Sequence, residues 1–165
     1  MIFVTVGNAT QGFSRLLKAV DELAAKGIFG SDPVFIQSGN NRTFFPAHCK
    51  HEMFLATDDF AQKVREANLI ICHAGAGTLI HVLQVGKIPV VMPRRKKHGE
   101  LVDDHQLELV QVLTAEGRVI PAYESEDLLN AIEEARRLTR HPAPQPPSPM
   151  LSLVAQAIEE LIGKP

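Results

Sequence analysis

Small residues follow a short apolar run in the middle of the chain, and their types suit the binding of phosphate. Residues 69–72 are typical of a buried strand, and the next helical pattern runs to Gly86, a natural helix stop. The turn between the two reads His73, Ala74, Gly75, Ala76, Gly77, Thr78. A helix N-terminus offers free N–H groups and a positive dipole end to an anion, and glycines let backbone approach a ligand. The turn therefore predicts a phosphate site, although the same glycines also fit a tight turn that binds nothing.

A basic loop follows the next predicted strand, residues 88–92, and offers a second source of positive charge. It contains Arg94, Arg95, Lys96, Lys97 and His98. Such cations could assist a phosphate site, but a run of charge is also typical of a solvated loop or of a surface that contacts anionic lipid. The helix after it begins near His105 and Gln106, whose side chains suit sugar hydroxyls or simply a water-exposed helix start.

Two further loops follow predicted strands nearer the start of the chain. Residues 1–6 are apolar and β-branched, and Gly7 and Asn8 come directly after them. Residues 33–37 form a second predicted strand, which ends at Ser38 and Gly39. Either loop could contact a ligand or act as a simple turn.

The remaining pattern alternates strands with amphipathic helices. We expect helices over 13–25, 58–66, 103–115 and 126–138, with Thr57 or Asp58 capping the second and Ser125 the last. Further strands are expected over 51–56 and 118–121. In the helix 103–115 the residues expected to point inward are Leu107, Leu109, Val110, Val112 and Leu113. This alternation predicts an α/β fold, a Rossmann-like three-layer sandwich with a parallel sheet, in which ligands bind at the carboxyl ends of the strands.

The chain is expected to comprise one domain and a tethered helix. Residues 1–140 form the domain, 141–149 contain five prolines and are expected to be a stiff linker, and 150–165 carry an amphipathic helix. That helix would dock on a partner or pack on its own domain.

Composition excludes several classes of function. The 165 residues carry a net charge of −2, which gives no general attraction to nucleic acid. Two cysteines without a pairing motif favour a reducing, cytoplasmic location, and we find no secretory signal and no run long enough to cross a bilayer. No cluster has metal-ligand spacing, so neither a metal nor a cofactor is expected.

Four blocks of sequence resemble the C-terminal, donor-binding domain of family 28 glycosyltransferases. They are residues 73–78, 86–89, 94–100 and 104–109, within a resemblance that covers about residues 1 to 137. The stand-alone form of this domain includes the catalytic subunit of the two-subunit enzyme that adds N-acetylglucosamine to a dolichol-linked sugar, and similar bacterial exopolysaccharide subunits. The resemblance implies one half of a GT-B architecture.

The resemblance also implies a function and a site. The chain would bind a UDP-sugar and transfer its hexose to a lipid-linked glycan, together with a membrane-anchored, acceptor-binding subunit at the cytosolic membrane face. The implied donor-binding residues are Gly7, Asn8, Ser38, Gly39, His73, Ala74, Gly75, Ala76, Gly77, Thr78, His81, Arg94, Lys97, His105 and Gln106. His73 borders this site, and the catalytic base stays unassigned.

One residue departs from the family pattern and keeps an alternative open. The family has glutamate, which holds the two ribose hydroxyls, at the position of His81. An imidazole cannot form that bidentate pair, so the chain could also be a catalytically degenerate nucleotide-sugar-binding or scaffold protein. A nicotinamide-dependent oxidoreductase fits poorly, because neither glycine loop has the G-x-G-x-x-G fingerprint.

Overall fold

A six-stranded, wholly parallel sheet forms the centre of the protein. The computed structural model describes residues 1–140. The strands are β1 (Ile2–Thr5), β2 (Val34–Gln37), β3 (Lys50–Glu52), β4 (Leu69–His73), β5 (Val90–Met92) and β6 (Ile120–Pro121). They lie in the order β3-β2-β1-β4-β5-β6, with every neighbouring pair parallel. The order reverses between β1 and β4, which is where open α/β sheets bind ligands.

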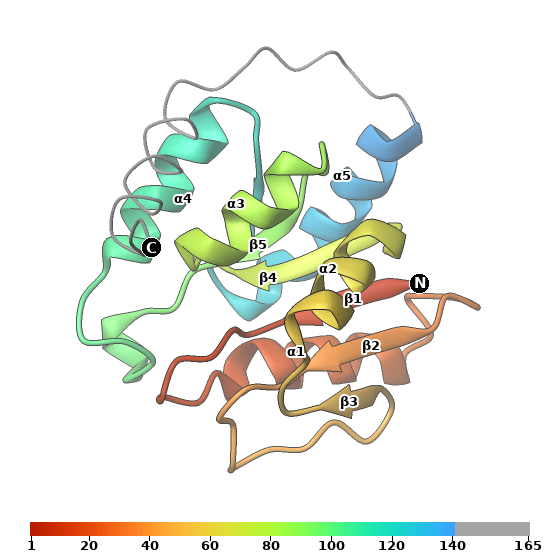
Figure 1. Cartoon of the computed structure of the whole chain (residues 1–165), viewed down its shortest axis with the longest axis horizontal. Coiled ribbons are helices and arrows are strands. Elements are labelled where there is room, and N and C mark those ends of the chain that lie inside the picture. The colour runs from red at the N-terminus through yellow and green to blue at the C-terminus, as the bar shows by residue number, and fades with distance from the viewer. Residues whose placement is uncertain (141–165) are drawn as a thin grey trace.

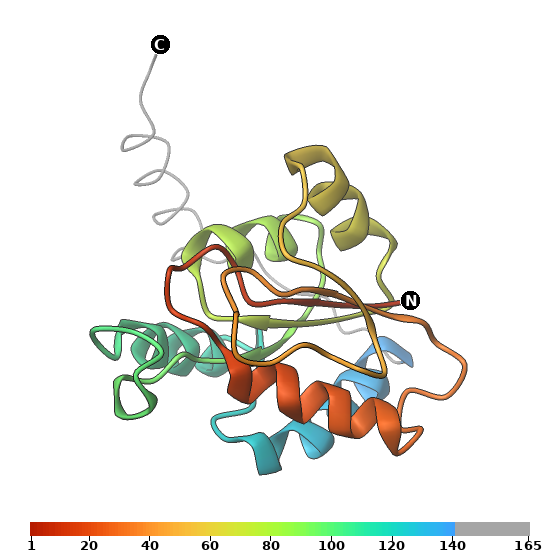
Figure 2. The same ribbon diagram turned by 90° about the horizontal axis from the view of Figure 1, so that it is seen from below.

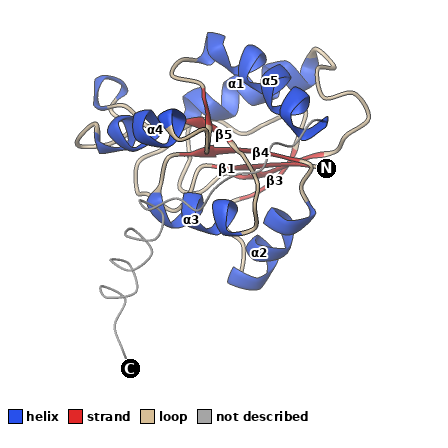
Figure 3. Cartoon of the chain, turned by 90° about the horizontal axis from the view of Figure 1, so that it is seen from above, coloured by secondary structure: helices blue, strands red, loops and turns tan. Residues whose placement is uncertain are grey.

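Helices cover both faces of the sheet, which confirms the predicted three-layer α/β fold. They are α1 (Ser14–Ala25), α2 (Thr57–Glu66), α3 (Ala76–Gln84), α4 (His105–Ala115) and α5 (Leu128–Arg140), with 3-10 turns η1 (Lys96–His98) and η2 (Ser125–Asp127). Figure 1 shows β3, β2, β1, β4 and β5 following one another across the sheet, and Figure 2 shows α1, in red-orange, along one face of it. Figure 3 shows α1 and α5 on one side of the sheet and α2 and α3 on the other.

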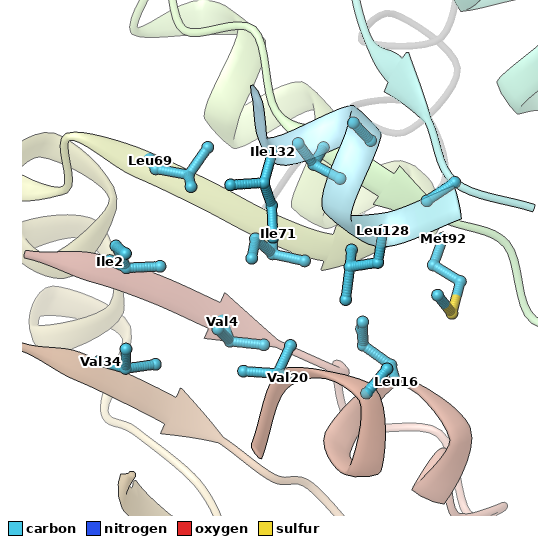
Figure 4. Packing of buried hydrophobic residues seen from close by; sticks show 14 of the residues in the cluster. Ile2, Val4, Leu16, Val20, Val34, Leu69, Ile71, Met92, Leu128 and Ile132 are labelled. Carbon is cyan, nitrogen blue, oxygen red and sulfur yellow. The ribbon is translucent and has the colours of Figure 1, made fainter. Parts of the chain in front are cut away.

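Alternation along the strands gives each face its own core. Ile2 and Val4 of β1 point to the face that α1 and α5 cover, where they share one apolar cluster with Leu16 of α1 and Ile132 of α5 (Figure 4). Phe3 points to the opposite face, into a cluster with α2, α3 and α4. Because both faces are buried, the central strands β1, β4 and β5 are almost continuously apolar, whereas the edge strand β3 is polar and largely exposed.

Several predicted element ends are wrong. The strand β3 ends at Glu52 rather than at residue 56, because its neighbour β2 ends at Gln37 and the chain then turns at Gly39, with φ +57. Neither Thr57 nor Asp58 caps α2, which has Ala56 as its N-cap without a side-chain bond.

Two predictions near the carboxyl end of the domain also need correction. Glu124, not Ser125, begins the last helical segment, in a capping box with Asp127. Val112 is exposed rather than inward, because Val110 and Leu113 already define the buried side of α4. The predicted linker and the helix after it lie outside the described residues. No helix among residues 1–140 is long and apolar enough to span a membrane.

Candidate functional site

A cavity of about 380 Å³ opens at the carboxyl ends of β1 and β4, where the strand order reverses. Its lining comes from the ends of β1, β2 and β4 and from α2 and α3. The lining residues are Thr5, Gly7, Asn8, Gln37, Leu55, Thr57, Phe60, His73, Gly75, Gly77, Thr78 and His81. The fold therefore brings together most of the predicted residues of the two glycine loops, which are separated by more than sixty positions in sequence.

The N-terminus of α3 forms one wall of the cavity and presents unpaired backbone donors to it. Gly75 is the N-cap, and no side chain bonds to the first N–H groups of the helix. The first turn contains no acidic residue that would neutralise the dipole. Ala76 is half-buried and Ala74 is buried behind the turn. The arrangement suits a phosphate group that accepts hydrogen bonds from this turn.

The imidazole of His73 lies between the two glycine loops. It is 7% exposed, and a Cβ built on Gly7 or on Gly75 would come within 3.0 Å of its ring. Burial lowers the pKa of His73 to about 4, and the positive charge of Arg94 adds to the shift. His73 is therefore neutral at pH 7, with one ring nitrogen as donor and the other as acceptor.

An aromatic pair forms the other end of the cavity. The rings of Phe60 and His81 meet edge to face, with centroids 5.7 Å apart, and Leu55 and Thr57 complete this wall. Sequence reasoning missed Leu55, Thr57 and Phe60 as site residues, because it placed Leu55 in a predicted strand and gave Thr57 and Phe60 only as the start and body of a helix. This end offers apolar surface and an edge of polar atoms, as a planar base and its ribose require.

Ser38 and Gly39 support the site from behind rather than line it. The amide and hydroxyl of Ser38 both donate to the carbonyl of Glu52, and Ser38 is buried. A Cβ on Gly39 would collide with the carbonyl oxygen of Gly7, so a glycine is required where these two loops touch.

Arg94 lies inside the protein, where it joins loops instead of reaching the cavity. It is 1% exposed. Its Nη1 donates to the carbonyls of Gln11, Gly12 and Glu100, and its Nη2 donates to the carbonyl of Val6 at 2.8 Å. The guanidinium also stacks over Phe13 at 4.8 Å. The structure thus gives Arg94 a scaffold role that the sequence analysis did not predict.

The rest of the basic loop contacts acidic residues outside the cavity. Lys97 and His98 lie against Glu124, and Arg95 contacts Glu124 and Asp104 at 3.7 and 3.6 Å. Lys97, although predicted to bind the donor, is therefore held away from the phosphate position.

His105 and Gln106 also lie outside the cavity lining. His105 is exposed beside Asp103 and Glu108. The Oε1 atom of Gln106 accepts the backbone N–H of Arg94 at 3.0 Å. A contact between either residue and a ligand requires a ligand that extends beyond this cavity.

A second cavity, of about 900 Å³, opens beside the first turns of α1 but offers weaker chemistry. Its most buried cation is Arg15, which is already bound to Glu100 through two nitrogens and to the carbonyls of Pro93 and Tyr123. The N-terminus of α1 also lacks a side-chain cap and borders this cavity, but a single glycine, Gly12, lies beside it among the described lining residues. We therefore assign the ligand site to the smaller cavity. In the described part of the chain no group of three or more His, Cys, Asp or Glu residues could hold a metal ion.

Comparison with known proteins agrees with this geometry. Residues 1–161 match the model of the glycosyltransferase family 28 C-terminal domain. The chain is 28% identical over 174 residues to the UDP-N-acetylglucosamine transferase subunit ALG13 of Yarrowia lipolytica, covering 99% of this chain and 85% of that protein. It is 33% identical over 126 residues to the human subunit of the same name, covering 72% of this chain but 10% of the human protein.

A solved structure shows the same fold. The glycosyltransferase SnogD from Streptomyces nogalater superposes with a TM-score of 0.52 at 19% identity, covering 98% of this chain and 44% of that one. The chain therefore spans less than half of the length of this structural neighbour.

Proposed function

The chain belongs to the glycosyltransferase family 28 C-terminal domain family, and we propose that it binds a UDP-sugar in the cavity between β1 and β4. It would transfer the hexose, N-acetylglucosamine or a similar sugar, to a lipid-linked glycan. The observation that carries this proposal is the uncapped N-terminus of α3, which meets the Gly7 loop across one cavity.

Loss of the diphosphate is the step that these residues would assist. Negative charge accumulates on the leaving UDP as the bond between the sugar and the phosphate breaks. The N–H groups of the first turn of α3 are fixed donors for that charge. The neutral His73 adds a short-range donor or acceptor without a fixed charge. The apolar end at Phe60 would hold the base, with His81 at its edge.

The acceptor must lose a proton, and a carboxylate is a common base for that step. Among residues 1–140, none that lines the cavity is a carboxylate. His73, with its pKa lowered to about 4, is a weak base at neutral pH. We therefore propose that a membrane-anchored partner binds the acceptor and completes the active site. The word "subunit" in the names of the relatives supports this, and such a partner would place the chain at the cytosolic membrane face.

A catalytically degenerate, sugar-nucleotide-binding protein is the second candidate. The feature that favours it is His81 at the nucleoside end, together with the lack of a carboxylate in the lining. Replacing His81→Glu separates the two candidates. A large gain in affinity for UDP would indicate a decayed or altered ribose site, whereas weaker binding would show that His81 serves the present ligand. Unchanged binding would show that residue 81 does not contact UDP.

Calorimetric titration with UDP and a panel of UDP-sugars tests the donor site. We expect Ala76→Asp to weaken the binding of UDP at least about tenfold, because its carboxylate would repel the diphosphate. A negative charge in the first turn of a helix interacts favourably with the helix dipole, so the variant should remain folded. Ser125→Asp adds the same charge to another first turn, outside this cavity, and is the matched control. Equal affinity in Ala76→Asp would exclude the α3 turn as the phosphate site.

Transfer assays test the need for a partner. The chain alone should bind UDP but transfer little sugar to a lipid-linked acceptor. Full transfer by the chain alone would contradict the two-subunit part of the proposal while leaving the donor site intact.

A further inference from the structure

Gln37 has a buried side-chain amide at the floor of the cavity, and the proposed donor site assigns it no contact with the ligand. It is the last residue of β2 and is 2% exposed. Its side chain reaches across to β1 and to the chain after β3, so it contacts both loops that border this end of the cavity. A polar side chain buried at this depth must be hydrogen-bonded, and its partners define its orientation.

The neighbouring hydrogen-bond partners determine which end of the Gln37 amide is Oε1 and which is Nε2. The N–H of Gly7 donates to the hydroxyl of Thr5 at 3.2 Å, so the hydroxyl hydrogen is free to donate to Gln37 Oε1. On its other side, Gln37 Nε2 faces the carbonyls of Gly7 and Met53, at 3.2 and 3.0 Å. Carbonyl oxygens only accept, so Nε2 must be the atom that faces them.

This direction extends to Asn8, whose amide would otherwise be free to turn either way. Gln37 Nε2 also lies 3.2 Å from Asn8 Oδ1. Because Nε2 can only donate, it selects the oxygen of the Asn8 amide as the inward end. The other end, Nδ2, has no hydrogen-bond partner among residues 1–140 and belongs to a side chain that lines the cavity. The backbone at Asn8 is held separately, since its carbonyl accepts from Asn40 Nδ2 at 3.2 Å.

The hydrogen bond from Gln37 Nε2 to Asn8 is the least constrained of its three contacts. An amide nitrogen carries two hydrogens, whereas three acceptors surround Gln37 Nε2. Two of these are backbone carbonyls that the fold fixes in place, whereas Asn8 is exposed and can bond to water instead. The contact therefore biases the orientation of Asn8 without locking the side chain.

We infer that Gln37 is a positioning residue that sets Asn8 with its N–H₂ group toward the cavity, as a donor for the diphosphate of the ligand. The inference rests on the proposed function for the identity of the ligand. Its structural part, the order that Gln37 imposes on Asn8, applies to the protein without ligand.

Nuclear magnetic resonance of the ligand-free protein tests the structural part. The ¹⁵N relaxation of the Asn8 side-chain amide should show more order in the wild type than in Gln37→Met, while the backbone amide of Asn8 is equally ordered in both. Gln62→Met is the matched control, because Gln62 is an exposed glutamine whose amide donates along α2 to Glu66 at 2.7 Å. An Asn8 amide that is equally ordered in Gln37→Met would overturn the inference, whether or not UDP binds.

A double-mutant cycle on the affinity for UDP and for inorganic pyrophosphate tests the functional part. Asn8→Ala should weaken binding about tenfold or more, because a donor to a charged group is lost. Gln37→Met should weaken it severalfold in the wild-type background but less than about twofold in Asn8→Ala, since its effect acts through Asn8. Equal losses in both backgrounds would show that Gln37 does not act through Asn8, and thermal unfolding of each variant separates either result from misfolding.

Asn8→Asp distinguishes a donor role of Asn8 toward the ligand from a merely structural role. Its carboxylate still accepts from Gln37 but has no hydrogen to offer, so stability should be kept while pyrophosphate binding is lost. Wild-type protein that binds neither UDP nor pyrophosphate would refute the proposed function, whereas retained pyrophosphate binding by Asn8→Asp would refute only this inference.

Discussion

The ring of His73 occupies the space that a side chain on Gly75 would need. A Cβ at that position would come within 3.0 Å of His73 Nε2, and the backbone of Gly75, with φ −74, would accept any residue. The glycine is therefore required by its neighbour and not by its own conformation. Gly77, two residues later, has open space at its Cβ position.

We predict opposite effects on stability for the same substitution at these two glycines. Gly75→Ala should lower the free energy of unfolding by about 1 to 3 kcal/mol, because His73 must leave its place. Gly77→Ala should raise it by about 0.5 to 1 kcal/mol, since alanine favours the helix that contains it. Urea unfolding of both variants measures this, and equal effects would contradict the assignment of His73 as the cause.

Stability should fall between pH 6.5 and pH 4 because of His73. Its pKa is about 4 in the folded protein, below the ordinary value of 6.5, so the unfolded chain binds the extra proton in this interval. The contribution is complete above pH 6.5, is lost as pH falls, and levels off below pH 4, for a total on the order of 3 kcal/mol. Denaturant unfolding at pH 7 and pH 5 should show a smaller difference in His73→Gln, and an unchanged difference would assign the effect to other groups.

Arg94→Lys should destabilise the protein by about 2 to 4 kcal/mol despite the retained charge. One ammonium group cannot serve the carbonyls of Val6, Gln11, Gly12 and Glu100 together, so buried acceptors lose their donors. Arg42→Lys, at an exposed position, is the control. The same midpoint of thermal unfolding for both variants would contradict the scaffold role of Arg94.

Glu124→Gln should increase binding to anionic vesicles. The carboxylate contacts Arg15, Arg95, Lys97 and His98, and the hydrogen bond from Lys97 is the main reason that the pKa of Glu124 is below its usual value. Each cation released at a membrane surface adds about 1 kcal/mol, or about fivefold in affinity. Vesicle co-sedimentation at two salt concentrations measures this. Glu126→Gln, which removes the same charge from η2 nearby, is the control, and equal binding by both variants would show that these cations are not masked by Glu124.

The sequence by itself determined the layered fold and the two glycine loops. Apolar strands alternate with amphipathic helices, and such local patterns depend on residues a few positions apart. The turn from His73 to Thr78 was predicted as a phosphate site for the same reason, because small residues at a strand end and a helix start are a local signal.

The tertiary structure decided which residues share the cavity and which serve the scaffold. Arg94 and Lys97 looked equally suited to a phosphate, yet one is buried beneath the loops and the other bonds to Glu124, 27 positions away in sequence. Gln37 and Phe60 gave no signal beyond a strand end and a helix face. The partner of a side chain depends on which distant segments pack beside it. That packing follows from the order of the strands and from the direction in which each side chain points, and a local sequence pattern contains neither.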